Sequence, residues 1–533
     1  MSYLPDDGSA RRRPIRATPH QPRYPTAIRR QRPVGLGRFF GMTTLGTLIP
    51  GSGLLLSGRR KAGGLLLTLF VLGVVGVAGA LAWYGVPNGA LYVAVRPRLT
   101  QALAVGMVLA AVLVAASVIA TGWLNRARPS SVGKNLLMSA FVGLMCALLV
   151  APTLLAGRYA LLSRDAITEI FTGSSLKPRD SARSAALADP EALANIPTIT
   201  VLLLGTDAYP NRPGIRTDSM MVASVDTETG DTTLFGIPRN LNGWQIRTTS
   251  PAAKLFPGGT RCGADCWLTN YWRTVSDYAT ANPGEFPGQR PSEVALTELT
   301  NVIDDFLGIS IDNTVIVDIR GFSELVDAVG GVDITVKERL PIGGKLNDAG
   351  QIVPGSITGY IETGRQHMDG YTAMWYARSR VTTDDFSRMR RQRCMLAALA
   401  RQVNPTTLVT KLPAILQVAQ SNIATDIDLS QLGLWSELAN RVQQGKIRSL
   451  PFTHKIFDNT KPDYAWVHQY VAHAIDPLVN PLPPTDGRGQ PWPKPAPTTK
   501  PSAAPGGSGQ PPSPAPATTT TDVEGLVDVS EAC

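Results

Sequence analysis

Two aspartates flank a short polar stretch in the motif LLLGTD followed by RTDS. Asp207 lies just past the end of one apolar run, and Asp218 lies just before the next. Ligands of open α/β sheets bind beyond the carboxyl ends of strands, and Mg²⁺ is typically held by one or two carboxylates together with substrate oxygens. The pair therefore predicts a site for Mg²⁺ or Mn²⁺ shared with a phosphate group. The alternative is that both carboxylates cap turns of the loop.

Arginines are the second feature whose side chains could do chemistry. Arg239 follows Pro238 at the end of an apolar stretch, in GIPRN. Six more lie close together in YARSR…DDFSRMRRQR: Arg378, Arg380, Arg388, Arg390, Arg391 and Arg393. Arginine binds phosphate groups through paired hydrogen bonds. Arginines facing two carboxylates are what phosphoryl transfer requires, because there the protein mainly positions groups and neutralises charge.

The second arginine group is predicted to lie on a helix that begins near Asp384 and Asp385. One face of this helix carries Arg388, Gln392, Met395 and Leu399. This spacing is helical, and Met395 and Leu399 are expected to face the core, so Arg388 and Gln392 continue the stripe inward. A buried arginine needs an anion, which is either Asp384 or Asp385 of the chain or a bound polyanion such as pyrophosphate. Arg390 and Arg393 are expected to lie in solvent.

The elements that must position these residues form an α/β domain with a sheet covered by helices. Apolar, β-branched runs predict strands over 196–204, 220–225, 232–237, 314–319 and 332–336. Helical spacing ending at glycine predicts helices over 292–307 and 322–329. The segment from Asp369 to about Gln444 is expected to be mostly helical.

Three segments before this domain are long and apolar enough to span a bilayer. They run over about 63–85, 100–123 and 136–156, and none contains Asp, Glu, Lys or Arg. A fourth apolar stretch, 39–57, is broken by Pro50 and Gly51. This stretch could be re-entrant, lie at the interface, or cross the membrane as well.

The distribution of positive charge predicts the topology. Of the formal net charge of +10, much lies in the first sixty residues. Lysine and arginine beside membrane helices favour the cytoplasmic side. With three crossings, the basic arm and the loop containing Arg126 and Lys134 lie on that side, and everything after about residue 157 lies outside. A basic arm can also bind nucleic acid, but beside membrane segments the topological interpretation is favoured.

These features divide the chain into five parts. They are a basic disordered arm (1–37), a membrane domain (38–157), a linker (158–195), an extracytoplasmic catalytic domain (196–475) and a tail rich in Pro, Ser and Thr (476–533). The tail composition predicts disorder or polyproline structure. Cys262 and Cys266 in RCGADC are spaced for a short disulfide in an oxidising compartment, and no nearby residues complete a zinc site.

Four stretches make the chain similar to the LytR–CpsA–Psr family. They are LLLGTD…RTDSMMVASVD, TTLFGIPRN, FSELVDAVGGVDITV and HMDGYTAMWYARSRVTTDDFSRMRRQR, in the family's order across about 200–400. The resemblance implies a mixed central sheet with flanking helices, and a long apolar pocket for a polyprenyl chain with its pyrophosphate at the mouth. It also implies transfer of a glycopolymer from that carrier to peptidoglycan, forming a phosphodiester.

The resemblance also implies roles for individual residues. Asp207 and Asp218 would hold Mg²⁺ or orient the acceptor hydroxyl. The pyrophosphate ligands would be Arg239, Arg380 and Arg388, with Arg216, Arg378 and Gln392 as further substrate-binding candidates. The chain departs from the family in having Asn240 where aspartate is common, and in having three membrane helices rather than one.

Two other functions fit the same residues. The first is hydrolysis of a polyprenyl-pyrophosphate lipid, with water as the acceptor. The second is a membrane regulator that binds such a lipid without turning it over. We expect the partners to be the lipid-linked polymer, a peptidoglycan acceptor and the bilayer, and not nucleic acid.

Overall fold

The computed structural model describes residues 35–85, 89, 92–93, 96–126, 131–172, 176, 179–189, 192–207, 215–403, 405–492, 527–529 and 533. The chain forms two compact units, one of residues 1–72 and 111–151 and the other of residues 73–110 and 152–533. Most of the basic arm, and residues 493–526 of the expected tail, lie outside the described residues.

Five helices account for the apolar third of the chain: α1 (Leu36–Leu48), α2 (Ser52–Leu56), α3 (Arg60–Tyr84), α5 (Pro97–Leu124) and α6 (Val132–Thr172). Among the described residues, three stretches are long and apolar enough to cross a membrane, namely Arg60–Tyr84, Arg98–Leu124 and Val132–Leu162. The expectation of three such segments is confirmed on length and composition. The broken stretch forms α1 and α2, which have 13 and 5 residues and are too short to span.

A seven-stranded mixed sheet forms the centre of the soluble domain, in the order β11-β10-β3-β2-β1-β4-β9. The strands are β1 (Thr198–Thr206), β2 (Thr217–Asp226), β3 (Thr232–Ile237), β4 (Asn313–Asp318), β9 (Ile423–Thr425), β10 (Ile447–Pro451) and β11 (Val527–Asp528). The pairs β1–β4 and β3–β10 are parallel, and the other neighbours are antiparallel. The expected mixed sheet is therefore confirmed.

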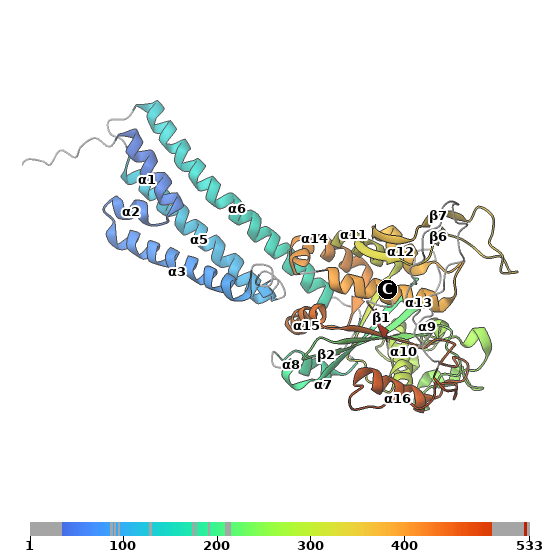
Figure 1. Cartoon of the computed structure of the whole chain (residues 1–533). Coiled ribbons are helices and arrows are strands. Elements are labelled where there is room, and N and C mark those ends of the chain that lie inside the picture. Colours follow the sequence, from blue (N-terminus) through green and yellow to red (C-terminus); the bar gives the residue numbers. More distant parts are fainter. Residues whose placement is uncertain are drawn as a thin grey trace, which may run out of the picture. The chain divides into compact units, whose positions relative to one another are not determined.

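Two small antiparallel sheets and a set of helices lie around this sheet (Figure 1). One pairs β5 (Val332–Val336) with β8 (Gly364–Met368), and the other pairs β6 (Leu340–Gly343) with β7 (Ile357–Ile361). The helices are α7 (Ser181–Leu187), α8 (Ala192–Asn195), α9 (Leu268–Ala281), α10 (Pro291–Leu307), α11 (Ile319–Val329), α12 (Gly370–Arg378), α13 (Asp385–Gln402), α14 (Pro405–Asn422), α15 (Leu432–Gln444) and α16 (Tyr464–Ile475).

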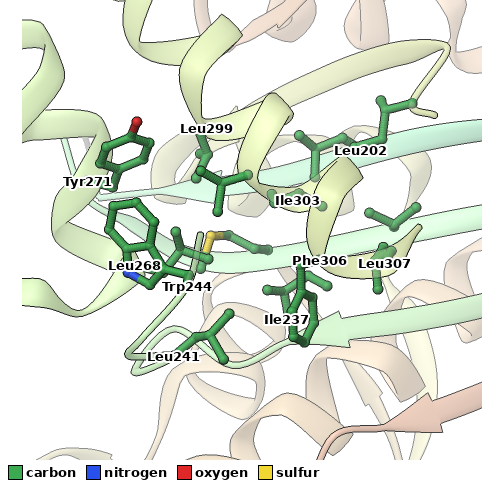
Figure 2. Packing of buried hydrophobic residues seen from close by; sticks show 14 of the residues in the cluster. Leu202, Ile237, Leu241, Trp244, Leu268, Tyr271, Leu299, Ile303, Phe306 and Leu307 are labelled. Atoms are coloured by element: carbon green, nitrogen blue, oxygen red, sulfur yellow. The ribbon is translucent and has the colours of Figure 1, made fainter. Parts of the chain in front are cut away.

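The sheet is buried on both faces. Successive residues of a strand point to opposite faces, and in these strands apolar residues point to both. Leu202 and Ile237 belong to the core on one face, where Figure 2 shows them near Ile303 and Phe306 of α10. The opposite face packs Met221, Leu234 and Ile447 against Ala397 of α13. The strands β2 and β3 thus lie directly under α13, the helix that carries the arginines.

Both described parts of the expected tail are ordered. Trp492 packs against Tyr470 of α16, with ring centroids 5.3 Å apart, and its Nε1 donates to the carbonyl of Pro483 at 2.7 Å. Farther along, Val527 and Asp528 form β11, and Cys533 forms a disulfide with Cys394 of α13. Residues 476–492 therefore pack onto the folded domain, although we expected them to belong to a disordered tail. Composition missed this because the contacts of Trp492 are made with α16, outside the tail itself.

Candidate active site

A β-bulge sets the position of Asp218. In the antiparallel β1–β2 pair, Gly205 lies opposite Ser219 and Thr206 lies opposite Thr217, so Asp218 is the extra residue. Bulges of this kind redirect a side chain and are common beside active sites. Asp218 therefore lies inside β2, whereas the sequence placed it just before the strand. Its side chain is 35% exposed.

Asp207 follows the last residue of β1, as expected, but it is more enclosed. Its Oδ1 accepts a hydrogen bond from the backbone N–H of Arg216 at 2.9 Å, and its own N–H donates to the carbonyl of Arg216 at 3.2 Å. The residue is 2% exposed, while the Arg216 residue itself is exposed. The backbone of Arg216 thus holds Asp207 in place through these two hydrogen bonds.

Arg239 meets Asp218 because the β2–β3 register continues beyond the end of β3. Met220 pairs with Ile237. Asp218, two residues before Met220, and Arg239, two residues after Ile237, therefore lie at the same edge of the sheet. Nη1 of Arg239 donates to Oδ1 of Asp218 at 2.8 Å, and Nε lies 3.3 Å from Oδ1 of Asp385. The arginine that follows β3 is therefore bound to carboxylates from two different elements.

Arg388 points inward, as its helical spacing predicts. Asp384 caps α13 by accepting from the N–H of Ser387 at 2.7 Å. One turn on, Nη2 of Arg388 lies 2.9 Å from Oδ1 of Asp385 and donates to the carbonyl of Asp218 at 3.2 Å. The Arg388 side chain is only 5% exposed. The intrachain ion pair is thus present, and it involves Asp385 rather than Asp384.

Burial lowers the pKa of the Arg388 guanidinium from its usual value, because water is withdrawn from the charged form. The carboxylate of Asp385 acts in the opposite direction, while the positive charge of Arg239 lowers the pKa further. The charges of Asp218 and Arg380 make smaller contributions of opposite sign. A buried cation in such surroundings favours additional negative charge beside it.

Gln392 and Arg393 extend the same helix face over the sheet. Oε1 of Gln392 accepts from the hydroxyl of Ser219 at 3.1 Å, and its Nε2 donates to the carbonyl of Ala377 at 3.3 Å. Arg393 is 6% exposed and lies over Gly236, where an added Cβ would be 2.8 Å from its Nη1. The expectation that Arg393 lies in solvent is wrong, because α13 approaches β3 closely at a glycine.

Arg390 is also more enclosed than expected, with a side chain 20% exposed and 3.6 Å from Glu338. Its neighbour Arg391 ties the preceding segment to α13. Nε of Arg391 donates to the carbonyl of Tyr376 at 2.9 Å, and Nη2 donates to the carbonyl of Ser379. These bonds fix the connection that carries Arg378 and Arg380.

Arg378 and Arg380 are exposed beside this assembly. The guanidinium of Arg378 lies 5.6 Å from the ring centroid of Trp375. Neither residue lines the cavity between α13 and the sheet, although the charge of Arg380 acts on Arg388. Of the candidate residues, the structure therefore brings Asp218, Arg239, Arg388 and Gln392 directly together, and places Arg380 nearby.

The cavity at this point has a volume of about 10 Å³, which is room for about one water molecule. Its lining is Asp218, Ser219, Met220, Met221, Gly236, Ile237, Arg239, Arg388, Met389, Gln392 and Arg393. Charged groups are thus combined with methionines, which repack easily because their side chains are unbranched and flexible. Sites for small molecules usually occupy roughly 300–1,000 Å³. In the described part of the chain, this cavity is therefore smaller than the long apolar pocket that we expected.

Two further residues contribute to the site: Asp385, which the sequence offered only as a possible partner of Arg388, and Thr269, which it did not select. Asp385 contacts both Arg239 and Arg388, and its position three residues before Arg388 on the helix was the available signal. Thr269 donates its N–H to the carbonyl of Arg239 at 2.9 Å, and its hydroxyl lies 3.5 Å from Oδ1 of Asp218. Nothing in the local sequence marks Thr269, because α9 reaches the site only through the fold.

The predicted short disulfide lies at the start of α9 and is confirmed between Cys262 and Cys266. The carbonyl of Cys266 accepts from Nε1 of Trp244 at 2.9 Å, and the N–H of Leu268 donates to the carbonyl of Leu241 at 3.1 Å. These contacts hold the start of α9 against the segment after β3. The disulfide therefore supports the placement of Thr269 beside Arg239.

The donor set suits a cation that is shared with a substrate better than one held by protein alone. Within the described ranges, no group of three or more His, Cys, Asp or Glu residues could hold a metal ion. Asp207 and Asp218 are at the same end of the β1–β2 pair, and Asp218 is partly open to solvent. Mg²⁺ commonly uses one or two carboxylates and completes its ligands with water and phosphate.

Comparison with known proteins identifies the region that carries α13. The LytR_cpsA_psr family model matches residues 294–481. This segment of the chain is therefore similar to the LytR–CpsA–Psr family. Arg378, Arg380, Arg388 and Gln392 fall inside the matched segment, whereas Asp207, Asp218 and Arg239 precede it. The contacts of Arg239 and Asp218 with α13 join the two sets of residues.

The relatives of the chain are distant. The chain is 24% identical over 259 residues to the polyisoprenyl-teichoic acid–peptidoglycan teichoic acid transferase TagV of Bacillus subtilis, over 48% of this chain and 56% of that protein. It is 32% identical over 142 residues to the TagU transferase of Halalkalibacterium halodurans, over 26% of this chain and 42% of that protein. The matches thus span about half the length of these relatives.

A crystal structure of Bacillus subtilis TagV also resembles part of the chain. It is 21% identical, covers 52% of this chain and 96% of that chain, and has a TM-score of 0.36. The similarity to the family therefore rests on the matched segment and not on this likeness.

Proposed function

We propose that the chain transfers a glycopolymer from a polyprenyl-pyrophosphate carrier to peptidoglycan and forms a phosphodiester link. The observation that carries the proposal is the meeting of Asp218, Arg239, Asp385 and Arg388, which come from two strands and one helix, at one small cavity. The names of the relatives TagV and TagU, which are teichoic acid transferases, support the same reaction class.

The arginines provide the binding site for the pyrophosphate. Arg239 and Arg388 are now neutralised by Asp218 and Asp385, at distances of 2.8 to 3.3 Å. Guanidinium groups bind phosphate oxygens through paired hydrogen bonds. We infer that the pyrophosphate takes over part of this pairing, with Arg380, Arg378 and Arg216 as further ligands from the exposed side.

The reaction requires little covalent participation by the protein. An acceptor hydroxyl of peptidoglycan attacks the sugar-side phosphorus, and a new P–O bond forms. The bond between that phosphorus and the bridging oxygen breaks, so polyprenyl phosphate leaves with the bridging oxygen and its electron pair. Asp218 or Asp207 accepts the proton of the hydroxyl, and the arginines stabilise the negative charge that develops on the phosphoryl oxygens.

A divalent cation, Mg²⁺ or Mn²⁺, is part of the proposal. Asp207 and Asp218 would hold it, and it would supply positive charge beside the pyrophosphate oxygens. The partial exposure of Asp218 supports a role in contact with substrate. The pairing of Asp218 with Arg239 would then change as the cation binds.

The expected location follows from the candidate membrane spans. With three crossings, the N-terminal arm is cytoplasmic and the soluble domain is extracytoplasmic. The Cys262–Cys266 and Cys394–Cys533 disulfides support an oxidising compartment. The partners would be the lipid-linked polymer, a peptidoglycan acceptor and the bilayer, with no role for nucleic acid.

The test uses the full chain in liposomes with a lipid-linked glycopolymer, peptidoglycan and Mg²⁺. Wild-type protein should attach polymer to peptidoglycan, and the Arg239→Ala, Arg388→Ala double variant should not. Arg320→Ala is the matched control, because Arg320 pairs with Glu324 on the exposed surface of α11. Unchanged attachment by the double variant would refute the assignment.

The products separate transfer from the other two functions. Free phosphorylated polymer without attachment to peptidoglycan would indicate a hydrolase. Binding of the lipid that depends on Arg239 and Arg388, without turnover of any acceptor, would indicate a regulator. Either result would replace the proposed transfer.

A further inference from the structure

The outward side of α12 carries two aromatic residues and an arginine at helical spacing. Tyr371, Trp375 and Arg378 are separated by four and then by three residues, so they lie along one side of the helix. Tyr371 is 51% exposed, Trp375 is half-buried and Arg378 is exposed. The opposite side of α12 carries Ala373 and Tyr376, which belong to the core. The three outward residues are here called the α12 stripe.

The side chains of the α12 stripe contact one another. The rings of Tyr371 and Trp375 meet edge to face, with centroids 6.4 Å apart, and the Arg378 guanidinium lies 5.6 Å from the Trp375 centroid. Nε1 of Trp375 has no hydrogen-bond partner, and Arg378 has no carboxylate partner among the residues that the structure describes. A ligand on the α12 stripe would therefore break no hydrogen bond or ion pair of these two groups.

The α12 stripe ends at the proposed active site. Gln392, which lines the cavity under α13, donates to the carbonyl of Ala377 at 3.3 Å, and Arg378 is the next residue. The helices α12 and α13 lie side by side (Figure 1). From Arg378 back to Tyr371 a helix rises about 10 Å. The stripe is therefore an exposed track, two turns long, that begins beside the arginines.

The sugars of a lipid-linked donor have to lie on such a surface, because the cavity under α13 has room for about one water molecule. In the proposed reaction the sugar-side phosphorus lies beside Asp218, whose side chain is 35% exposed, and the first sugar is attached to that phosphate. A pyranose has C–H groups on its faces and hydroxyls at its rim. The C–H faces suit the electron-rich faces of aromatic rings, and the hydroxyls accept hydrogen bonds from a guanidinium.

A bilayer is the other surface that attracts exposed aromatic residues, but α12 fits a saccharide better. A helix that lies on a membrane has a broad apolar face. In α12, all of whose residues are described, Tyr371 is the only large apolar residue that is exposed. Two rings followed by one cation are thus too narrow for a membrane-binding face and match a chain of sugars that ends in a phosphate.

We propose that the α12 stripe binds the saccharide next to the pyrophosphate of the donor. Tyr371 and Trp375 pack against the faces of the sugar rings, and Arg378 donates hydrogen bonds to the sugar that follows the phosphate. The inference rests on the proposed function, since the saccharide is that of a lipid-linked glycopolymer. The stripe thereby favours a donor that carries sugars over the bare lipid pyrophosphate.

The experiment measures two affinities of the full chain in lipid nanodiscs, for farnesyl pyrophosphate and for the same lipid carrying an N-acetylglucosamine disaccharide. Wild-type protein should bind the glycosylated lipid more tightly, and the ratio of the two affinities is the readout. Tyr371→Ala should lower this ratio by about two- to tenfold, the range of one aromatic contact, without changing the affinity for farnesyl pyrophosphate. Tyr371→Phe keeps the ring and should retain the wild-type ratio.

Tyr360→Ala is the matched control, because Tyr360 is 43% exposed but the Arg339 guanidinium lies over its ring at 3.6 Å. Both affinities should stay as in wild type. Trp375→Phe tests the second ring with a small change of buried volume, and it should lower the ratio as well. A wild-type ratio in Tyr371→Ala would overturn the proposal. An equal loss of affinity for both lipids would also overturn it, because Tyr371 would then contact the bilayer or the lipid and not the sugar.

Failure of the proposed function gives a different result, in which wild-type protein binds neither lipid. A free N-acetylglucosamine tetramer, which has no pyrophosphate, then decides whether the α12 stripe binds saccharide. Weaker binding of the tetramer by Tyr371→Ala than by wild type would support the stripe as a saccharide site. Equal or absent binding by the two proteins would refute it.

Discussion

Arg239 lies 2.8 Å from Asp218, and the antiparallel register of β2 and β3 is the cause. The register that pairs Met220 with Ile237 carries the two charged residues to the same sheet edge. Asp385 then joins this pair to Arg388 from the helix above. The balance between two arginines and two carboxylates leads to the first two predictions.

Arg388→Lys should weaken binding of pyrophosphate by about tenfold, equivalent to one hydrogen bond to a charged group. Nη2 of Arg388 contacts both Asp385 and the carbonyl of Asp218. Lysine keeps the charge but loses the planar guanidinium, which binds phosphate through paired hydrogen bonds. Isothermal titration with inorganic pyrophosphate and Mg²⁺ measures the change. Arg320→Lys is the control, and equal affinity of the two variants would contradict the role given to Arg388.

Asp385→Asn should destabilise the free protein and increase its response to pyrophosphate. Without the carboxylate, Arg239 and Arg388 lose a shared anion, and a bound phosphate replaces it. The melting temperature should fall without ligand, and the increase on adding pyrophosphate should exceed that of wild type. Glu362→Gln serves as the control, because Glu362 is an exposed carboxylate that pairs with Arg339. A smaller increase than in wild type would show that Asp385 assists anion binding instead.

Gly236→Ala should lower the stability of the domain by about 1–3 kcal/mol, the usual cost of overpacking. The added Cβ would lie 2.8 Å from Nη1 of Arg393 and 3.1 Å from Cε of Met389, so α13 must shift. Thermal unfolding of the full chain measures the effect. Gly284→Ala has no neighbour within 4 Å of the new Cβ and should change little. Equal effects of both changes would mean that α13 is not closely packed at Gly236.

Asp426 should make stability depend on pH. Burial raises the pKa of its carboxyl from 3.8 to about 6, although Thr314 and Asn313 donate hydrogen bonds to it. The folded state therefore holds the proton more tightly than the unfolded state. The stability from this group is fully present below pH 3.8 and is lost as pH rises through about 6, by up to about 3 kcal/mol.

The matching experiment measures unfolding of wild type and Asp426→Asn between pH 4 and 7. The variant should lack this contribution to the pH dependence, because asparagine does not titrate. Asp189→Asn, on the surface connection after α7, should retain the wild-type dependence. Identical pH profiles for wild type and Asp426→Asn would rule out the raised pKa.

The sequence by itself determined the local elements. Apolar β-branched runs gave β3 and β5 at their observed bounds, and glycine ended α10 at Gly308 and α11 at Gly330. These features depend on nearby residues, so periodicity and capping were sufficient. The same reasoning found three candidate membrane spans, the Cys262–Cys266 disulfide and the inward direction of Arg388.

Only the tertiary structure decided which of these residues meet. The bulge at Asp218, the burial of Arg393 over Gly236 and the contact of Thr269 with Arg239 each depend on segments far apart in the chain. The same holds for β11 and Cys533, because nothing near them in the sequence indicates their contacts with β10 and Cys394. Helical or strand periodicity describes one element at a time, whereas the site is made where β2, β3, α9 and α13 pack together.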